Sequence, residues 1–194
     1  MERPILFNTD MVKAILEGRK TQTRRILKPQ PTNINPEYLY AIDETKQPFK
    51  EINQPYSKGD TLWVRETWGD YDGEVRYYLY RADYQDGAKT FEWSERDEFG
   101  EEIICDLPKW HPSIHMPRDA ARIFLKVTDV RVERLQKITE DGAAKEGFIS
   151  NQISTWEHSP FSTAIERFKS TWDSIYNNWQ ENPWVWVIGF ERMV

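Results

Sequence analysis

The chain has 194 residues, and its 26 lysines and arginines against 32 aspartates and glutamates give a formal net charge of −6 at pH 7. An aromatic content of 14% excludes a disordered chain, and a single cysteine excludes an internal disulfide. Because we find neither a signal peptide nor an apolar run long enough to cross a bilayer, we expect a soluble, cytoplasmic protein.

The amino-terminal segment is predicted to be a short strand over residues 3–7 followed by a helix over residues 9–17. Asn8 or Thr9 can cap the start of this helix, and Gly18 stands where a left-handed residue ends it. The apolar positions of the helix fall on one stripe: Met11, Val12, Ile15 and Leu16.

Residues 18–25 hold four cations and two hydroxyls within eight positions. Residues 21–26 then alternate with the period of a strand. A charge run of this kind is usually a solvated basic edge. A lysine that is flanked by cations and leads into a strand can also lose part of its proton affinity, which makes Lys20 a candidate general base.

Residues 57–68 combine a turn with a strand. The turn is at residues 57–60, and alternation then places Leu62, Val64, Glu66 and Trp68 on one face and Thr61, Trp63, Arg65 and Thr67 on the other. An acid, a cation and aromatics lie together at Trp63, Arg65, Glu66 and Trp68, a combination that can hold a nucleobase. A core strand with a cross-strand Arg–Glu pair is the structural alternative.

Two segments, 29–56 and 69–117, interrupt this framework. The first is rich in proline and polar residues, and we expect a partly ordered insertion. The second is predicted to begin with a hairpin whose returning strand covers residues 75–81, whereas residues 84–108 are acidic and expected to be irregular.

The stretch 110–118 is dense in groups that suit a binding rim, and Trp110 and His115 are its candidates. A loop fixed by its two prolines is the alternative. Because these prolines argue against a regular helix, His111 and His115 are not expected to form a zinc pair, and we expect no metal and no cofactor.

The remaining elements carry clear local signals. A long strand is predicted over residues 122–135 with a bend or bulge at 128–129. Two helices follow: one is capped by Thr139 and ends at Gly147, and the other opens at Ser162 or Thr163 with a capping box to Glu166. Residues 184–191 form a strand that is apolar on both faces, which is typical of a central strand.

The elements together predict a mixed α/β (α+β) fold in one domain over residues 1–194. We expect about six or seven strands, mostly antiparallel, with about three helices. A small β-barrel with the helices packed outside is the simplest closure.

The basic stretch resembles the signature of the ASCH family, of the larger phage or prophage type, through Gly18, Lys20, Thr21, Thr23 and Arg25. A Gly-Asp turn before a strand (residues 59–60) and a glutamate in a short helix (Glu146) match the family as well. The resemblance covers residues 3–28, 57–68 and 118–194. It implies a small PUA-like barrel, with 29–56 and 69–117 as insertions within it.

Some ASCH proteins are amidohydrolases that deacylate N4-acetylcytidine with a lysine, a threonine and a glutamate. Carried over, these are Lys20, Thr23 and Glu146. Lys20 would take a proton from Thr23 or a water, and a protonated Glu146 would give one to the leaving amine. Residues three apart on a strand face opposite ways, so Lys20 would have to curl back over the strand to meet Thr23.

The expected partner is a modified nucleoside or RNA, with no membrane involved. Two alternatives to an amidohydrolase stay open: a PUA-like RNA-binding module without turnover, and a ribonuclease that uses the same lysine and glutamate. The predicted substrate contacts are Arg19, Thr21, Arg24, Arg25, Trp63, Arg65, Glu66, Trp68, Trp110 and His115.

Overall fold

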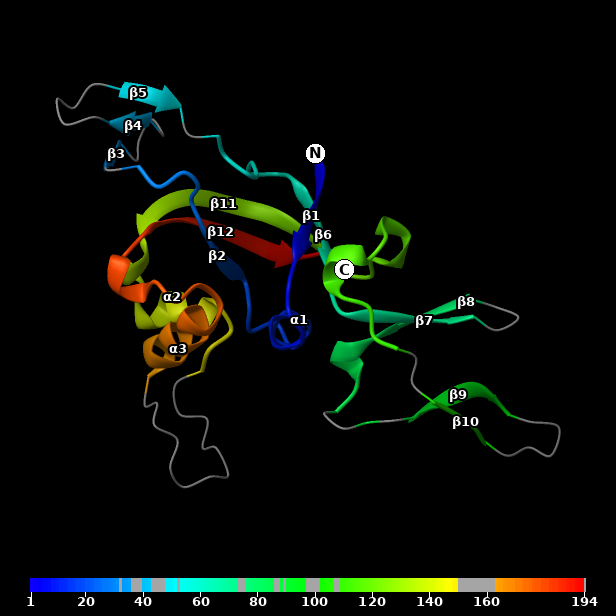
Figure 1. Cartoon of the computed structure of the whole chain (residues 1–194). Helices are drawn as coiled ribbons and strands as arrows, with labels where there is room; N and C mark the ends of the chain where they lie inside the picture. Colours follow the sequence, from blue (N-terminus) through cyan, green and yellow to red (C-terminus); the bar gives the residue numbers. More distant parts are fainter. Residues whose placement is uncertain are drawn as a thin grey trace. The chain divides into compact units, whose positions relative to one another are not determined.

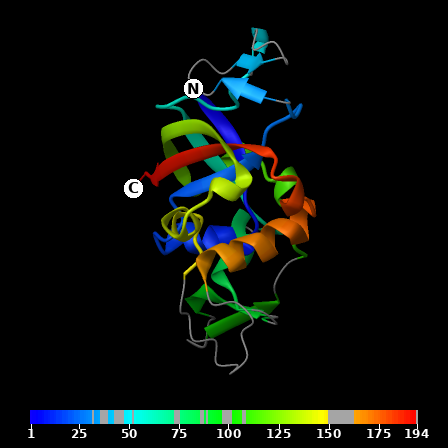
Figure 2. The same ribbon diagram turned by 90° about the vertical axis from the view of Figure 1, so that its left-hand side faces the viewer.

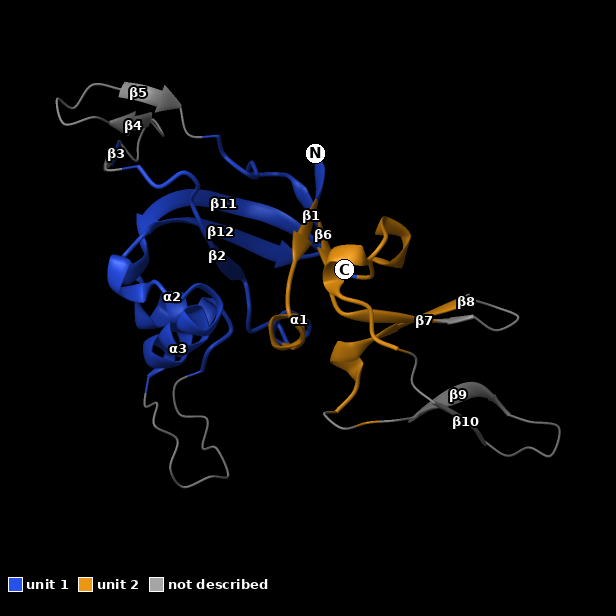
Figure 3. Ribbon diagram, viewed as in Figure 1, with its two compact units in different colours: residues 1–3, 14–62, 123–194 blue, residues 4–13, 63–122 orange. Residues whose placement is uncertain are grey.

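The computed structural model describes residues 1–31, 33–35, 40–42, 48–51, 53–72, 76–85, 88, 90–96, 102–106, 109–149 and 163–193. The chain forms two compact units, one of residues 1–3, 14–62 and 123–194 and the other of residues 4–13 and 63–122 (Figure 3). The helices and strands (Figure 1) are β1 (Glu2–Leu6), α1 (Thr9–Leu16), β2 (Gln22–Ile26), β3 (Asn33–Asn35), β4 (Tyr40–Ile42), β5 (Pro48–Glu51), β6 (Thr61–Arg65), β7 (Trp68–Asp72), β8 (Arg76–Tyr80), β9 (Thr90–Arg96), β10 (Glu102–Asp106), β11 (Phe124–Arg134), α2 (Glu140–Lys145), α3 (Ala164–Tyr176) and β12 (Trp184–Arg192).

The main sheet has the strand order β1-β6-β11-β12-β2. β12 pairs antiparallel with β11 on one side and with β2 on the other, which confirms the central position predicted from its apolar faces. The register of β11 shifts between Val127 and Asp129, as the change of phase in the sequence predicted. Among the described residues, β1 and β2 are the two edge strands of this sheet, and its closure into a barrel stays a prediction.

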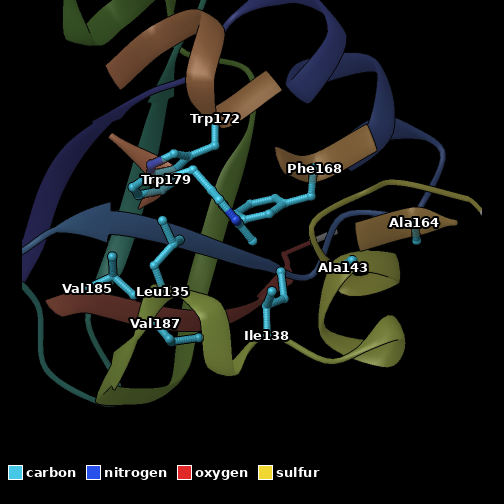
Figure 4. Packing of buried hydrophobic residues seen from close by; sticks show 9 residues of the cluster. All are labelled: Leu135, Ile138, Ala143, Ala164, Phe168, Trp172, Trp179, Val185 and Val187. Atoms are coloured by element: carbon cyan, nitrogen blue, oxygen red, sulfur yellow. The ribbon is translucent and has the colours of Figure 1, made fainter. Parts of the chain in front are cut away.

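The helices α2 and α3 lie together on one side of β2 and β12 (Figure 2). They cover the sheet face that carries Val185 and Val187, and Figure 4 shows Phe168, Trp172 and Trp179 packed toward these two valines. Burial of such large side chains contributes on the order of 2–3 kcal/mol each, so this cluster anchors both helices. Ile165 and Tyr176 of α3 also pack against this cluster, whereas Ile175, which the helical spacing places on the same apolar stripe, is 52% exposed.

The ends of these helices follow the sequence signals. Thr139 Oγ1 accepts a hydrogen bond from Gly142 N at 3.0 Å at the start of α2. Thr163 and Glu166 form the predicted capping box of α3. Gly147, with φ of +101°, follows Glu146, the C-cap residue of α2, in the left-handed conformation that glycine adopts without steric cost.

The second unit contains the hairpin of β7 and β8 that the sequence predicted. Its buried side chains include Trp68, Met116 and Ala120, and Tyr80 packs against them while its hydroxyl donates to Ala120 O at 2.8 Å. The alternation predicted for residues 61–68 is confirmed, because Leu62, Val64, Glu66 and Trp68 are all buried.

The count of six or seven strands is wrong, since twelve strands are formed among the described residues. Segment 84–108 was expected to be irregular, but it carries the paired strands β9 and β10. Segment 29–56 carries a small sheet of β3, β4 and β5. Local hairpins need only turn geometry and short pairing, which a polar composition does not reveal. Both segments lie partly outside the described residues, and their status as insertions in a single domain stays a prediction.

No helix in the described part of the chain is long and apolar enough to cross a membrane.

Candidate functional site

The basic stretch leaves α1 through a tight turn. Gly18 has φ of +75°, and the backbone N–H groups of Arg19 and Lys20 both donate to Ala14 O at 2.9 Å. Lys20 then pairs with Glu146 as an isolated antiparallel bridge, and Thr21 N donates to Lys145 O at 2.9 Å. The start of this strand therefore runs beside the carboxyl end of α2. The sequence predicted that Lys20 curls back over the strand. The backbone of Lys20 is instead extended and pairs with that of Glu146.

Lys20 and Glu146 form a buried ion pair. Lys20 Nζ lies 2.8 Å from Glu146 Oε2 and 3.0 Å from its backbone oxygen, and the two side chains are 0% and 3% exposed. Burial lowers the pKa of the Lys20 ammonium below its ordinary value, because loss of water disfavours the charged form. The Glu146 carboxylate opposes this shift in the pKa of Lys20 but does not cancel it.

Arg24 contacts the same carboxylate from β2. Its Nη1 donates to Glu146 Oε1 at 3.1 Å, and its Nη2 lies 3.4 Å from Glu133 Oε2 on β11. The Arg24 side chain is 2% exposed, and its guanidinium lies 5.8 Å from the centre of the Phe168 ring. Each carboxylate oxygen of Glu146 therefore contacts one cationic side chain.

The polar network continues along β11 toward solvent. Arg131 Nε donates to Glu133 Oε1 at 2.6 Å, and Arg131 Nη2 donates to Gln22 Oε1 at 3.3 Å. Arg131 also pairs with Asp129 at 2.7 Å, where both side chains are about half exposed. Gln22, Arg131 and Glu133 were not predicted as site residues from the sequence. Strand alternation could have found Gln22, which lies between Lys20 and Arg24 on the same face.

Thr23 and Arg25 lie on the opposite face of β2. Their cross-strand partners on β12 are Ile188 and Trp186, whereas Arg24 is paired with Val187 on the helix-covered face. Directly opposed residues in an antiparallel pair share a face, so alternation directs Thr23 away from Glu146. The catalytic role of Thr23 and the substrate role of Arg25 stay predictions.

Two other predicted contacts lie near the carboxyl end of α2. Arg19 donates to Gly147 O and pairs with Glu17. Thr21 is exposed, and its backbone accepts a hydrogen bond from Phe190 N at 2.8 Å. Their roles in substrate binding also stay predictions.

The candidates in the second unit have other neighbours. Glu66 is buried and receives a two-pronged contact from Arg122, at 3.0 and 3.1 Å, so its partner is not Arg65. Burial raises the pKa of Glu66, and Arg122 opposes that shift. The Arg65 and Arg118 guanidinium carbons lie 5.5 and 5.9 Å from the centre of the Trp63 ring.

The other aromatic candidates of this unit differ in exposure. Trp68 is buried and its ring lies 4.9 Å from that of His111. Trp110 is half-buried, beside Tyr84, and His115 is exposed. Among the described residues, no three His, Cys, Asp or Glu side chains gather as a metal site. The expectation of no metal and no cofactor stays a prediction.

No protein-family model matches this sequence, and no curated protein matches it. A search of solved structures finds similarity to the crystal structure of an ASCH domain from Lactobacillus crispatus JV V101, with 13% sequence identity and a TM-score of 0.39. The match covers 98% of this chain and 79% of that chain. That solved structure is an ASCH domain, and the basic stretch of the present sequence resembles the signature of the same family.

Proposed function

We propose that this protein hydrolyses the exocyclic amide of an N4-acylated cytidine or a closely similar modified nucleoside. The observation that carries this proposal is the buried contact of 2.8 Å between Lys20 Nζ and Glu146 Oε2. These two residues match the lysine and glutamate of the ASCH hydrolase motif, although 126 positions separate them in the chain. With the same resemblance we propose that the main sheet closes into a PUA-like barrel.

Lys20 is proposed as the general base. Burial lowers its pKa, so a larger fraction of its side chain is the neutral amine near neutral pH than in an exposed lysine. A neutral amine can take a proton from a water molecule, and the resulting hydroxide attacks the acyl carbonyl of the substrate. The carbonyl becomes a tetrahedral oxyanion in this step, and Lys20 becomes an ammonium.

Glu146 is proposed to move that proton to the leaving group. Its carboxylate accepts hydrogen bonds from Lys20 and Arg24 through separate oxygens, which is the geometry of a base rather than of a protonated acid. Glu146 therefore takes the proton from the Lys20 ammonium and passes it to the exocyclic nitrogen as the C–N bond breaks. The products are cytidine and a carboxylic acid, and the proton count is balanced.

We propose water rather than Thr23 as the nucleophile. Alternation along β2 directs Thr23 to the face opposite Arg24, while Lys20 and Arg24 share the carboxylate of Glu146. Attack by a water molecule does not require the side chains of Thr23 and Lys20 to meet across the sheet. Lys20 and Glu146 are therefore the two residues that transfer protons in this mechanism.

Binding of a nucleoside or RNA without turnover is the second candidate, and a different observation favours it. The exposed Arg118 and the half-buried Arg65 both lie within 6 Å of the Trp63 ring centre. An indole with guanidinium groups beside it can stack on a base and contact its phosphate. In this alternative the Lys20–Glu146 pair only joins β2 to α2.

Incubation of the purified full-length chain with N4-acetylcytidine tests the main proposal, both as the free nucleoside and within a short RNA. Chromatography should show cytidine and acetate from the wild type, whereas Lys20→Met should release neither above background. Lys145→Met is the matched control, because Lys145 is an exposed lysine on α2 beside Glu146. The absence of product from both substrates with folded wild type, or cleavage of the RNA strand instead, would contradict amide hydrolysis.

A further inference from the structure

Arg24 is the second cation of the buried cluster, and both ends of its guanidinium are occupied. One terminal nitrogen contacts Glu146 at 3.1 Å, and the other lies 3.4 Å from Glu133. The side chain is only 2% exposed. Both terminal nitrogens of Arg24 are therefore engaged by carboxylates within the cluster, and its expected substrate contact stays a prediction.

The surroundings of Arg24 restrict its movement. The Phe168 ring of α3 lies 5.8 Å from the guanidinium carbon. On the α2 side, a Cβ placed on Gly142 would be in van der Waals contact with Arg24 Nη2 at 3.4 Å, so the helix backbone lies close to the guanidinium. Arg24 is thus held between two helices and two carboxylates.

We propose that Arg24 is a positioning residue for the Lys20–Glu146 pair: it fixes one oxygen of Glu146 and so directs the other oxygen at Lys20. This inference rests on the proposed function for its catalytic consequence. Without Arg24, the Glu146 carboxylate is free to rotate about its last torsion, and the line of proton transfer from Lys20 is no longer defined.

The charge of Arg24 has a second effect on the pair. A nearby cation disfavours the ammonium form of lysine, and Arg24 and Arg25 both act on Lys20 in this direction. Glu146 at the end of α2 acts in the opposite direction. Glu133 on β11 contacts Arg24, and Arg131 contacts Glu133 and Gln22. From the end of α1, Arg19 contacts the backbone of Gly147.

These charges predict opposite effects for two substitutions. Arg24→Gln removes a cation and should raise the pKa of Lys20. Glu133→Gln removes the carboxylate that balances Arg24, so it should lower the pKa of Lys20. If Arg24 contributed only packing, Arg24→Gln would not raise the pKa of Lys20. Arg24→Lys keeps the charge and should return the pKa toward the wild-type value.

The pKa of Lys20 can be followed by NMR of lysine side chains in isotopically labelled full-length protein, with the Lys20 signal identified by its absence from Lys20→Met. Lys145→Gln is the matched control, because it removes an exposed cation next to Glu146 in sequence. We expect Lys145→Gln to shift the Lys20 pKa less than either test substitution. In the hydrolysis assay, kcat/KM of Arg24→Gln should fall on the order of tenfold at neutral pH, with its acidic limb moved to higher pH.

An unchanged Lys20 pKa in folded Arg24→Gln, or shifts of the same sign in Arg24→Gln and Glu133→Gln, would overturn the positioning role. If Arg24→Gln does not fold, Glu133→Gln is the remaining test, because the Glu133 side chain is 24% exposed and its replacement should leave the fold intact. An unchanged Lys20 pKa in Glu133→Gln would then overturn the positioning role. The NMR readout requires no substrate. A wild type that hydrolyses nothing but shows the two opposite shifts would therefore refute the proposed reaction while supporting the role of Arg24.

Discussion

Lys20 Nζ and Glu146 Oε2 lie 2.8 Å apart in the interior of the first unit, and their backbones pair as an antiparallel bridge. The contact joins the strand that follows α1 to the carboxyl end of α2. Because Arg24 holds the second oxygen of the same carboxylate, two buried cations depend on one buried anion. This 2:1 arrangement determines how the protein should respond to substitution.

Removal of the carboxylate should be the most damaging change in the cluster. Glu146→Gln leaves Lys20 and Arg24 buried without their common counter-charge, and we expect a loss of about 3–5 kcal/mol in the free energy of unfolding. Lys20→Met should cost less, because Glu146 keeps Arg24. Urea unfolding checks both values. Glu133→Gln is the control, since its carboxylate is partly exposed; an equal loss there would mean that burial of the pair is unimportant.

The lowered pKa of Lys20 makes stability depend on pH. Between that lowered pKa and the ordinary lysine value of 10.5, the unfolded chain binds one more proton at this site than the folded chain. The free energy of unfolding should therefore rise with pH across this window, and below it the full cost of the buried ammonium is present. Unfolding curves of wild type and Lys20→Met at several alkaline pH values isolate the effect, because the other groups are common to both. A difference that stays constant with pH would show that the pKa of Lys20 is not lowered.

Gly147 positions Glu146 through its conformation, and Gly18 provides a matched comparison. Both have positive φ, but a Cβ on Gly147 would lie 2.9 Å from Ala14 Cβ, whereas a Cβ on Gly18 meets nothing within 4 Å. Gly18→Ala should cost about 1–2 kcal/mol from backbone strain alone. Gly147→Ala should cost more and should also lower activity, because it displaces the neighbouring Glu146. Thermal unfolding with the hydrolysis assay measures both, and equal losses of stability would contradict the close approach.

The local elements around the site could be predicted because their signals are local. Thr139, Gly147 and the capping box at Thr163 each depend on residues within four positions. The pairing of Lys20 with Glu146 could not be derived in this way, and only the resemblance to a family brought them together. Neither residue type nor spacing shows that the end of α2 lies beside this strand.

The rest of the network depends on register across three strands. Glu133 is paired with Val185 of β12, and Arg24 is paired with Val187 of the same strand, so both side chains lie on the face that the helices cover. The bulge in β11 determines which residues of that strand lie on this face. A one-residue change of register would direct Glu133 to the other face of the sheet. Such register is fixed by packing of the whole sheet. By contrast, simple alternation places Lys20 and Arg24 on the same face. This shared face was not predicted, because Lys20 was expected to curl back over the strand.

Thr23 distinguishes attack by water from attack by a side-chain hydroxyl. Thr23→Val keeps the size and β-branching of this buried residue and removes only the hydroxyl. If water attacks, kcat should stay within about threefold of the wild type, which is less than 1 kcal/mol in the barrier. A fall on the order of 10² or more, in a variant that unfolds like the wild type, would place Thr23 in the chemistry and overturn the proposed nucleophile.

The most direct test of the central proposal is the single-turnover rate of N4-acetylcytidine hydrolysis by wild type and Lys20→Met, with binding measured in parallel. Methionine keeps an unbranched stem and removes the ionisable nitrogen. If Lys20 is the general base, the rate should fall by a factor on the order of 10²–10⁴ while the Kd for the nucleoside changes little. If Lys20 acts only through its charge, the loss should appear in Kd and diminish as salt rises. An unchanged single-turnover rate in Lys20→Met would contradict the proposed mechanism.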